Sequence, residues 1–157
     1  MSQGIKKDNF VGGRIMGIDF GSKRIGISIS DPTLTIAQGL FVFENNSDVF
    51  DKIEKICLEY GVGLIVVGFP VSLNGKYSNK TREVLEFIDK LKSRLKIEVI
   101  KWDERFTTKI AQRTKIEMNM KKSKRREKKV DDLIASTLIL QGYLDFLKNK
   151  EKMLEKG

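Results

Sequence analysis

Acidic residues stand inside or directly beside the most apolar segments of this sequence. Asp19 interrupts the apolar run RIMGIDF, and Asp103 and Glu104 end the run IEVIKWDE. Asp131 and Asp132 directly precede the apolar run LIASTLIL. Because a carboxylate that is buried without a partner costs free energy, these positions need a structural or a chemical explanation.

Clustered carboxylates have a well-defined chemistry. They repel one another and raise each other's pKa until a divalent cation removes the repulsion, and hard oxygen ligands suit Mg²⁺ or Mn²⁺. Two such ions about 4 Å apart could activate a water and stabilise the leaving oxygen in phosphodiester hydrolysis. The sequence has no histidine, which excludes a histidine base and most zinc sites. A metal-dependent hydrolase of phosphodiesters is therefore one hypothesis.

Each acid also has a structural explanation. Asp19 could accept hydrogen bonds from the turn that follows it, and Asp103 and Glu104 could pair with Arg105 on the surface. One of the two aspartates at 131 and 132 could be a helix N-terminal charge that the dipole favours. Apart from Arg105, we expect no cationic partner for the acids within their own segments. The spacing alone does not decide between these explanations.

The net charge of +9 is concentrated in one segment. Seven cations fall within nine residues and are opposed only by Glu127, which leaves +6. A like-charged cluster of this density favours a polyanion partner, and nucleic acid fits better than a membrane because no apolar helical face accompanies the run. A solvated loop is the alternative. The cations are Lys121, Lys122, Lys124, Arg125, Arg126, Lys128 and Lys129.

Hydrophobic periodicity predicts the elements that carry these residues. Two strands joined by a tight turn at Gly21 and Ser22 form a hairpin, a third strand follows, and Ser47 caps a first helix that ends at Gly61. A helix that begins at Thr107 or Thr108 precedes the basic run. The predicted strands are 14–20, 24–30, 36–43, 63–70 and 97–104, and the predicted helices are 47–60, 79–95, 107–118 and 130–147.

This order of elements predicts an α/β fold. A three-strand meander followed by β-α units gives a mixed five-stranded sheet with helices on both faces. Ligands collect at the carboxyl ends of parallel strands in such sheets. Asp19 lies near the carboxyl end of the first strand, and Asp103 and Glu104 lie at that of the fifth. If the last helix packs across these strands, the acids meet there.

The bulk properties are those of one globular domain. With 157 residues, 40% of them hydrophobic, the chain can bury a real core. We expect a flexible arm at 1–13, a single domain at 14–147 and a lysine-rich tail at 148–157. The one cysteine, Cys57, is expected in the core. No signal core or membrane-spanning run is present, so we expect a cytoplasmic protein.

Four ordered blocks of the sequence resemble the YqgF (RuvX-like) family. They are GIDFGSKRIGISISDP at 17–32, IVVGFPVSLNG at 65–75, WDERFTT at 102–108 and KKVDDLIASTLILQGYL at 128–144, and the resemblance covers about residues 14–147. It implies an RNase H-like fold and a metal-dependent nuclease that matures the 5′ end of pre-16S rRNA. The family has also been described as Holliday junction resolvases.

The resemblance implies which acids form the site. The family's acids correspond to Asp19, Asp103, Glu104 and, eight places before Leu140, Asp132 rather than Asp131. The expected cofactor is Mg²⁺ or Mn²⁺. In the second block the family usually has an acid before the glycine, whereas this chain has Asn74, which puts a charged role for that loop in doubt.

Other functions remain open at this point. The chain could cleave four-way DNA instead of RNA, and a resolvase would act as a dimer because it makes two symmetric cuts. It could also be a nucleic-acid-binding module with an inactive site. Actin-like ATPases and sugar kinases share an Asp-x-Gly turn, but 157 residues cannot hold their two domains. The sequence does not decide between a monomer and a homodimer, or between endonuclease and exonuclease action.

Overall fold

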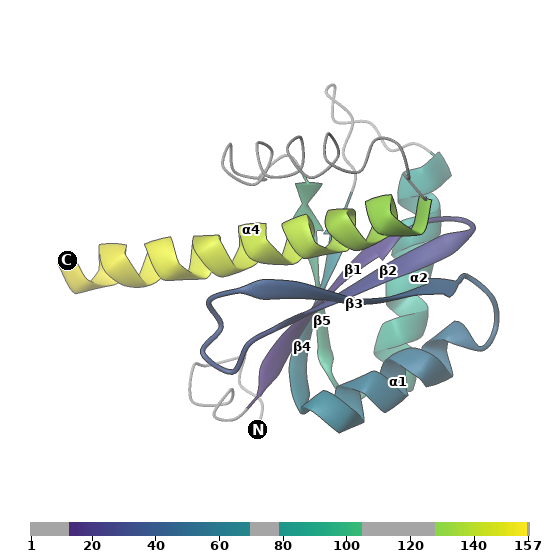
Figure 1. The fold of residues 1–157 in the computed structure, drawn as a ribbon, viewed down its shortest axis with the longest axis horizontal. Coiled ribbons are helices and arrows are strands. Elements are labelled where there is room, and N and C mark those ends of the chain that lie inside the picture. Colours follow the sequence, from purple (N-terminus) through teal and green to yellow (C-terminus); the bar gives the residue numbers. More distant parts are fainter. Residues whose placement is uncertain (1–12, 70–78, 105–127, 157) are drawn as a thin grey trace.

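The protein is described by a computed structural model that covers residues 13–69, 79–104 and 128–156. Within these residues, eight elements follow one another along the chain (Figure 1). The strands are β1 (Arg14–Phe20), β2 (Arg24–Ser30), β3 (Ala37–Glu44), β4 (Val62–Phe69) and β5 (Glu98–Asp103). The helices are α1 (Val49–Tyr60), α2 (Asn79–Arg94) and α4 (Lys128–Lys156). The helix expected at 107–118 lies outside the described residues.

The described strands form one mixed sheet in the order β3-β2-β1-β4-β5. The meander β1-β2-β3 is antiparallel, and β4 and β5 are parallel to β1 and to each other. The predicted meander followed by β-α units is therefore confirmed. Because β1, β4 and β5 run in the same direction, their carboxyl ends lie at one end of the sheet.

Two hydrophobic cores cover the two faces of the sheet. The larger core contains apolar residues of α1 and α2 packed on alternate strand residues such as Met16, Ile18 and Ile65. The second core lies beneath α4 and contains Ile15 and Val66 from the same strands. Figure 1 shows α4 crossing one face of the sheet, opposite α1 and α2. Helices on both faces, as the sequence predicts, are confirmed.

The ends of two helices differ from expectation. Asp48, not Ser47, precedes α1, and its side chain makes no capping hydrogen bond; Gly61, at φ 66°, ends the helix as predicted. The last helix begins at Lys128 rather than Val130 and continues to Lys156 instead of ending at Leu147. Its final turns extend beyond the sheet (Figure 1). No Gly or Pro interrupts residues 143–156, and Lys, Glu, Leu and Met are good helix formers.

No helix in the described part of the chain is both long enough and apolar enough to cross a membrane. The first twelve residues lie outside the described part, so the arm expected at 1–13 and the boundaries of the single domain remain predictions.

Candidate active site

Asp19 lies on the face of the sheet that α4 covers. Side chains alternate along a strand, and Met16, Ile18 and Phe20 belong to the core under α1 and α2. Ile15 belongs to the core beneath α4, so Asp19, four residues later, shares its face. Asp19 is partly exposed and lies near the carboxyl end of β1.

Glycines flank Asp19 on both neighbouring strands. Gly26 of β2 is its cross-strand partner, and Gly68 of β4 lies one residue beyond the last β1–β4 pair, Ile18–Val67. A Cβ at Gly26 would lie 2.4 Å from the backbone oxygen of Asp132, and one at Gly68 would lie 2.4 Å from Ile139 Cδ1. The absence of side chains here lets α4 approach the sheet and brings Asp132 close to the strand that carries Asp19.

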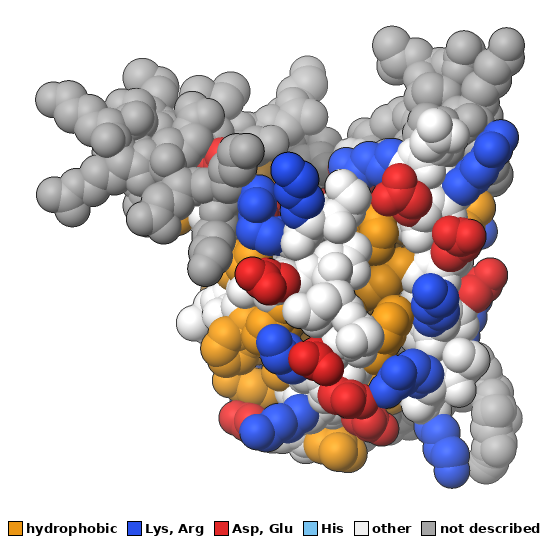
Figure 2. All heavy atoms as spheres, turned by 90° about the vertical axis from the view of Figure 1, so that its right-hand side faces the viewer, with side chains coloured by type: hydrophobic (Ala, Val, Ile, Leu, Met, Phe, Trp, Pro, Cys, Tyr) orange, Lys and Arg blue, Asp and Glu red, His pale blue; other side chains and the backbone are white. Residues whose placement is uncertain are grey.

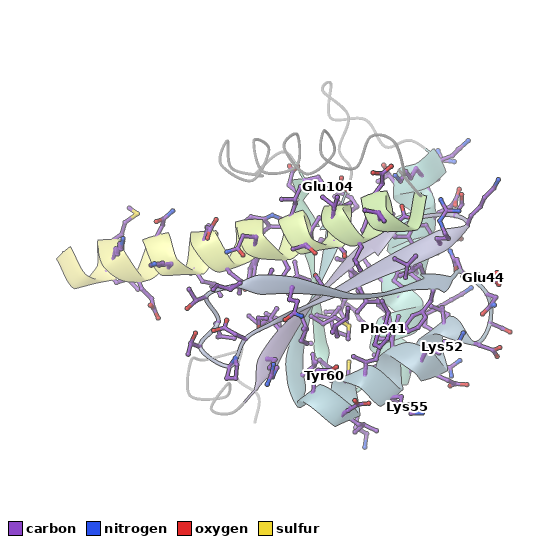
Figure 3. All side chains as sticks on the ribbon, in the orientation of Figure 1. Phe41, Glu44, Lys52, Lys55, Tyr60 and Glu104 are labelled. Atoms are coloured by element: carbon purple, nitrogen blue, oxygen red, sulfur yellow. The ribbon has the colours of Figure 1, made fainter. Side chains whose placement is uncertain are left out.

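Glu104 also lies on this face. Figure 3 shows Glu104 at the upper end of the sheet, near α4. Its Oε2 atom would be 3.3 Å from a Cβ at Gly68, the glycine beside Asp19. Its neighbour Asp103 points the other way: Trp102 packs in the core beneath α4, so the next residue faces the side of α1 and α2. The structure therefore brings Asp19, Glu104 and Asp132 to one end of one face and leaves Asp103 on the opposite face.

Asp132 has a cationic partner that we did not expect. Arg24 Nε donates a hydrogen bond to Asp132 Oδ2 at 2.7 Å. The expectation concerned partners within the acids' own segments, whereas Arg24 comes from the segment of Asp19 and pairs with an acid of the last segment. Arg105 itself lies outside the described residues. Asp131 lies in the first turn of α4, where an acid is favoured by the helix dipole.

A cavity of about 330 Å³ opens beside this ion pair. The β1–β2 turn, the start of α2 and the start of α4 form its walls. Its lining combines three cations with two acids, which suits a phosphate held next to an acidic centre. The lining residues are Gly21, Ser22, Lys23, Arg24, Lys80, Glu83 and Asp132.

Most of the basic run lies outside the described residues, namely Lys121, Lys122, Lys124, Arg125 and Arg126. Lys128 and Lys129 are the first residues of α4. The run therefore leads directly into the helix that carries Asp132. Its role in binding nucleic acid remains a prediction.

The acids fit a hard divalent cation in donor chemistry but are not arranged around one. Asp19, Glu104 and Asp132 offer only oxygen ligands on one face, and the two glycines beside Asp19 let α4 approach the sheet there. In the described part of the chain, however, no group of three or more His, Cys, Asp or Glu side chains could hold a metal ion. The Asp132 carboxylate is directed towards Arg24. A metal ion bound through Asp132 Oδ2 would have to displace Arg24 from this atom.

Cys57 offers no alternative chemistry. Its side chain extends from α1 into the larger hydrophobic core, as expected. Burial raises the pKa of the thiol to about 12, with a smaller contribution from Glu54. The thiol therefore stays protonated at neutral pH and is a poor nucleophile.

The cations of the cavity wall were not predicted from the sequence. The side chain of Arg24 points away from the face of β2 that carries the buried residues Ile25 and Ile27. It therefore lies on the same face of the hairpin as Asp19. The alternation along β2 could have suggested that the two residues lie on one face. No comparable signal marks Lys80 or Glu83, because both lie on the ordinary polar side of an amphipathic helix.

Comparison with known proteins agrees with this geometry. A family model described as "RuvX: Holliday junction resolvase" matches residues 13–146. A relative from Acetivibrio thermocellus named "Putative pre-16S rRNA nuclease" is 50% identical over 136 residues, which cover 84% of this chain and 95% of the relative. A relative of the same name from Thermoanaerobacter pseudethanolicus is 46% identical over 140 residues, covering 87% of this chain and 99% of the relative.

Two solved structures share the fold at low sequence identity. Thermus thermophilus RuvC in complex with a Holliday junction is 13% identical, with a TM-score of 0.55 and coverage of 85% of this chain and 96% of that chain. The fowlpox virus resolvase with Holliday junction DNA is 16% identical, with a TM-score of 0.52 and coverage of 85% and 98%. The mixed sheet is therefore of the RuvC type, within the RNase H-like class.

Proposed function

This chain belongs to the RuvX family, and on that premise we propose that it is a metal-dependent nuclease that hydrolyses phosphodiester bonds at the 5′ end of pre-16S rRNA. Relatives that are 46–50% identical over most of the chain carry the name of a pre-16S rRNA nuclease. They support RNA as the substrate. The protein would bind this RNA in the cytoplasm.

One observation carries the proposal: Asp19 lies between two glycines on the face where Glu104 and Asp132 also lie. These three carboxylates would hold Mg²⁺ or Mn²⁺. When bound, such ions lower the pKa of a water and neutralise charge on the leaving oxygen. Asp19 is fixed on a central strand, which holds its carboxylate in the position that such chemistry requires.

Arg24 and its neighbours supply the other half of the site. Lys23, Arg24 and Lys80 line the cavity beside Asp132 and would neutralise a phosphate of the substrate backbone. When Arg24 moves from Asp132 to a phosphate, the Asp132 carboxylate becomes available as a ligand. Substrate and metal would thus enter the site together.

The experiment compares two substrates side by side. Wild-type protein is incubated with a pre-16S 5′-leader RNA or with a synthetic four-way DNA junction, in Mg²⁺, Mn²⁺ or EDTA. We expect cleavage of the RNA that depends on the metal. Symmetric cutting of the junction alone would instead favour the resolvase function that the family description names. Binding without cleavage of either substrate would favour an inactive binding module.

Asp19→Asn is the decisive variant. It keeps the shape of the side chain but removes the charge, so cleavage should fall by several orders of magnitude while folding and RNA binding persist. Asp131→Asn is the matched control, because it removes one charge from the same helix as Asp132 without altering the three proposed ligands. An Asp19→Asn protein that cleaves RNA at the wild-type rate would contradict the mechanism.

A further inference from the structure

A second cavity, of about 290 Å³, lies next to the candidate active site on the opposite side of the sheet end. We call it the aromatic groove. Its floor is formed by Phe20, Phe50 and Phe87 from β1, α1 and α2. Phe20 and Phe87 are 5.0 Å apart between ring centroids, and Phe50 and Phe87 are 5.4 Å apart. On this side of the molecule, Figure 2 shows an apolar strip bordered on one side by charged side chains.

One wall of the groove is the β3–α1 loop, residues 45–47. This loop is tied to the β1–β2 turn that lines the active-site cavity: the Asn45 backbone N–H donates to Lys23 O at 2.9 Å, and Asn45 Nδ2 donates to Gly21 O at 2.8 Å. Asn46 Oδ1 accepts a hydrogen bond from the Asp48 backbone. These hydrogen bonds hold the loop against the β1–β2 turn, so the walls of the two cavities are linked through this turn.

The other wall is one side of α2. Glu83, Glu86 and Lys90 line it, at spacings of three and four residues that place them on a single helix face. Glu83 lines the active-site cavity as well, so the two cavities share one wall residue and are neighbours. Both glutamates are exposed and form no ion pair with another residue of the described ranges.

The chemistry of these walls favours a base over a phosphate, because the aromatic groove has two carboxylates and one cation, whereas the active-site cavity has two acids and three cations. Two carboxylates repel the nucleic-acid backbone, whereas they accept hydrogen bonds from amino and imino groups. The Watson–Crick edge of guanine offers two adjacent donors and then an acceptor, which matches a carboxylate followed by the Lys90 ammonium. Uracil offers a single donor between two acceptors. Phe20 and Phe87 are buried and Phe50 is half-buried, so Phe50 would supply most of the apolar contact that an unstacked base requires.

We propose that the aromatic groove binds an unpaired guanine of the substrate strand, adjacent to the phosphate held in the active-site cavity. This inference rests on the proposed nuclease function and adds a substrate requirement to it. A base within a duplex is stacked and paired, so it cannot enter the groove. The strand next to the cleaved bond is therefore single-stranded and carries guanine at one fixed position.

The test measures binding without cleavage. Fluorescein-labelled single-stranded RNA of seven uridines is compared with the same RNA carrying one central guanine, in EDTA, by fluorescence anisotropy. The two probes have equal length and charge, so the cations of the protein bind them equally. We expect about tenfold tighter binding of the guanine probe by wild-type protein, the effect of one well-formed base contact.

Two variants assign the preference to the groove. Glu86→Gln should abolish the guanine preference, whereas Asp89→Asn, which removes one negative charge from an exposed position of the same helix outside the groove, should retain it. Phe50→Leu keeps an apolar side chain but loses the flat ring, so it should weaken binding of the guanine probe more than that of the uridine probe.

The outcome separates this inference from the proposed function. Equal binding of the two probes by wild-type protein, or a preference that Glu86→Gln leaves intact, would overturn the groove as a guanine site even if the protein cleaves pre-16S RNA. Failure of the nuclease function is observed separately, as absence of metal-dependent cleavage by the wild-type protein. If the nuclease function and the guanine site are both correct, moving the guanine along a cleavable RNA should move the cleavage position by the same number of nucleotides in the wild-type protein. In the Glu86→Gln variant the cleavage position should not follow the guanine.

Discussion

Arg24 Nε and Asp132 Oδ2 lie 2.7 Å apart and join the start of β2 to the start of α4, although 108 residues separate them in the sequence. Their side chains are 28% and 26% exposed, so the pair lies at the border of the protein and solvent. The guanidinium holds the Oδ2 atom of Asp132. A divalent cation bound at this carboxylate, as proposed above, would compete with Arg24 for it.

Removal of Arg24 should make metal binding easier. Arg24→Met keeps the apolar stem, removes the competing charge, and should lower the Mn²⁺ concentration of half-maximal thermal stabilisation several-fold. Without metal, stability should change by less than about 1 kcal/mol because the pair is partly exposed. A Mn²⁺ titration of the melting temperature measures both effects. Arg94→Met is the control, since it breaks the Arg94–Asp51 pair between α2 and α1; equal midpoints in both variants would contradict the competition.

The two neighbouring acids at the end of β5 should behave differently. Glu104→Gln should reduce metal-dependent cleavage by at least about a hundredfold, because its carboxylate lies beside Gly68 on the face of Asp19. Asp103→Asn should retain most of the activity, because its side chain points to the opposite face. Single-turnover cleavage of the leader RNA distinguishes them. Equal loss in both variants would show that Asp103 also reaches the metal.

The glycines beside Asp19 should tolerate a methyl group unequally. In Gly26→Ala the new Cβ meets the backbone oxygen of Asp132 at 2.4 Å, and a helix backbone cannot easily move, so we expect a loss of about 1–3 kcal/mol in unfolding free energy. In Gly68→Ala it meets the Cδ1 atom of Ile139, the end of a side chain that can rotate, so the loss should be smaller. Urea denaturation measures both. A larger loss at Gly68 would contradict this packing.

Asp31 should make stability depend on pH in the acidic range. Hydrogen bonds from the Ile36 backbone and the Thr33 hydroxyl, and to a lesser extent from the Thr35 backbone, lower the pKa of Asp31 from 3.8 to about 2, against a small opposing effect of burial. Because the folded pKa lies below the unfolded one, the charged carboxylate stabilises the protein above about pH 4, and this stabilisation is lost as the pH falls towards 2.

The matching variant is Asp31→Asn. At pH 7 it should lose about 0.5–1 kcal/mol, because the site is largely open to solvent. The difference from wild type should shrink as the pH falls from 4 to 2, where the wild-type carboxyl becomes protonated. Denaturant titrations across this range measure it, with the exposed Asp89→Asn as control. A difference that stays constant with pH would contradict the assigned hydrogen bonds.

The basic run before α4 should control the salt dependence of RNA binding. Combined replacement of Lys121, Lys122, Arg125 and Arg126 by Ala should weaken binding to all sequences. It should also reduce the slope of log affinity against log salt by about 0.7 for each phosphate of a single strand that the variant no longer neutralises. Anisotropy titrations at several salt concentrations measure the slope. An unchanged slope would assign the run to a solvated loop.

The order and type of the described elements could be predicted from local patterns. The alternation of Ile25, Ile27 and Ile29 with small residues indicates a strand, and the turn at Gly21 and Ser22 indicates a hairpin; that α4 buries the second face as well, with Ser28 and Ser30, does not follow from this alternation. These signals depend only on residues a few positions apart. The end of α1 at Gly61 was equally predictable, because a left-handed residue there is best supplied by glycine.

Other features depend on the packing of distant segments. Strand alternation shows that Asp103 and Glu104 point in opposite directions, but the docking of α4 on one face decides which of them lies on the side of Asp19. Likewise, Arg24 and Asp132 are ordinary charged residues in the sequence and become partners only because glycine at position 26 lets the helix backbone approach the sheet. Local patterns determine which elements form, whereas the close packing of α4 against the strands determines which acids and cations meet.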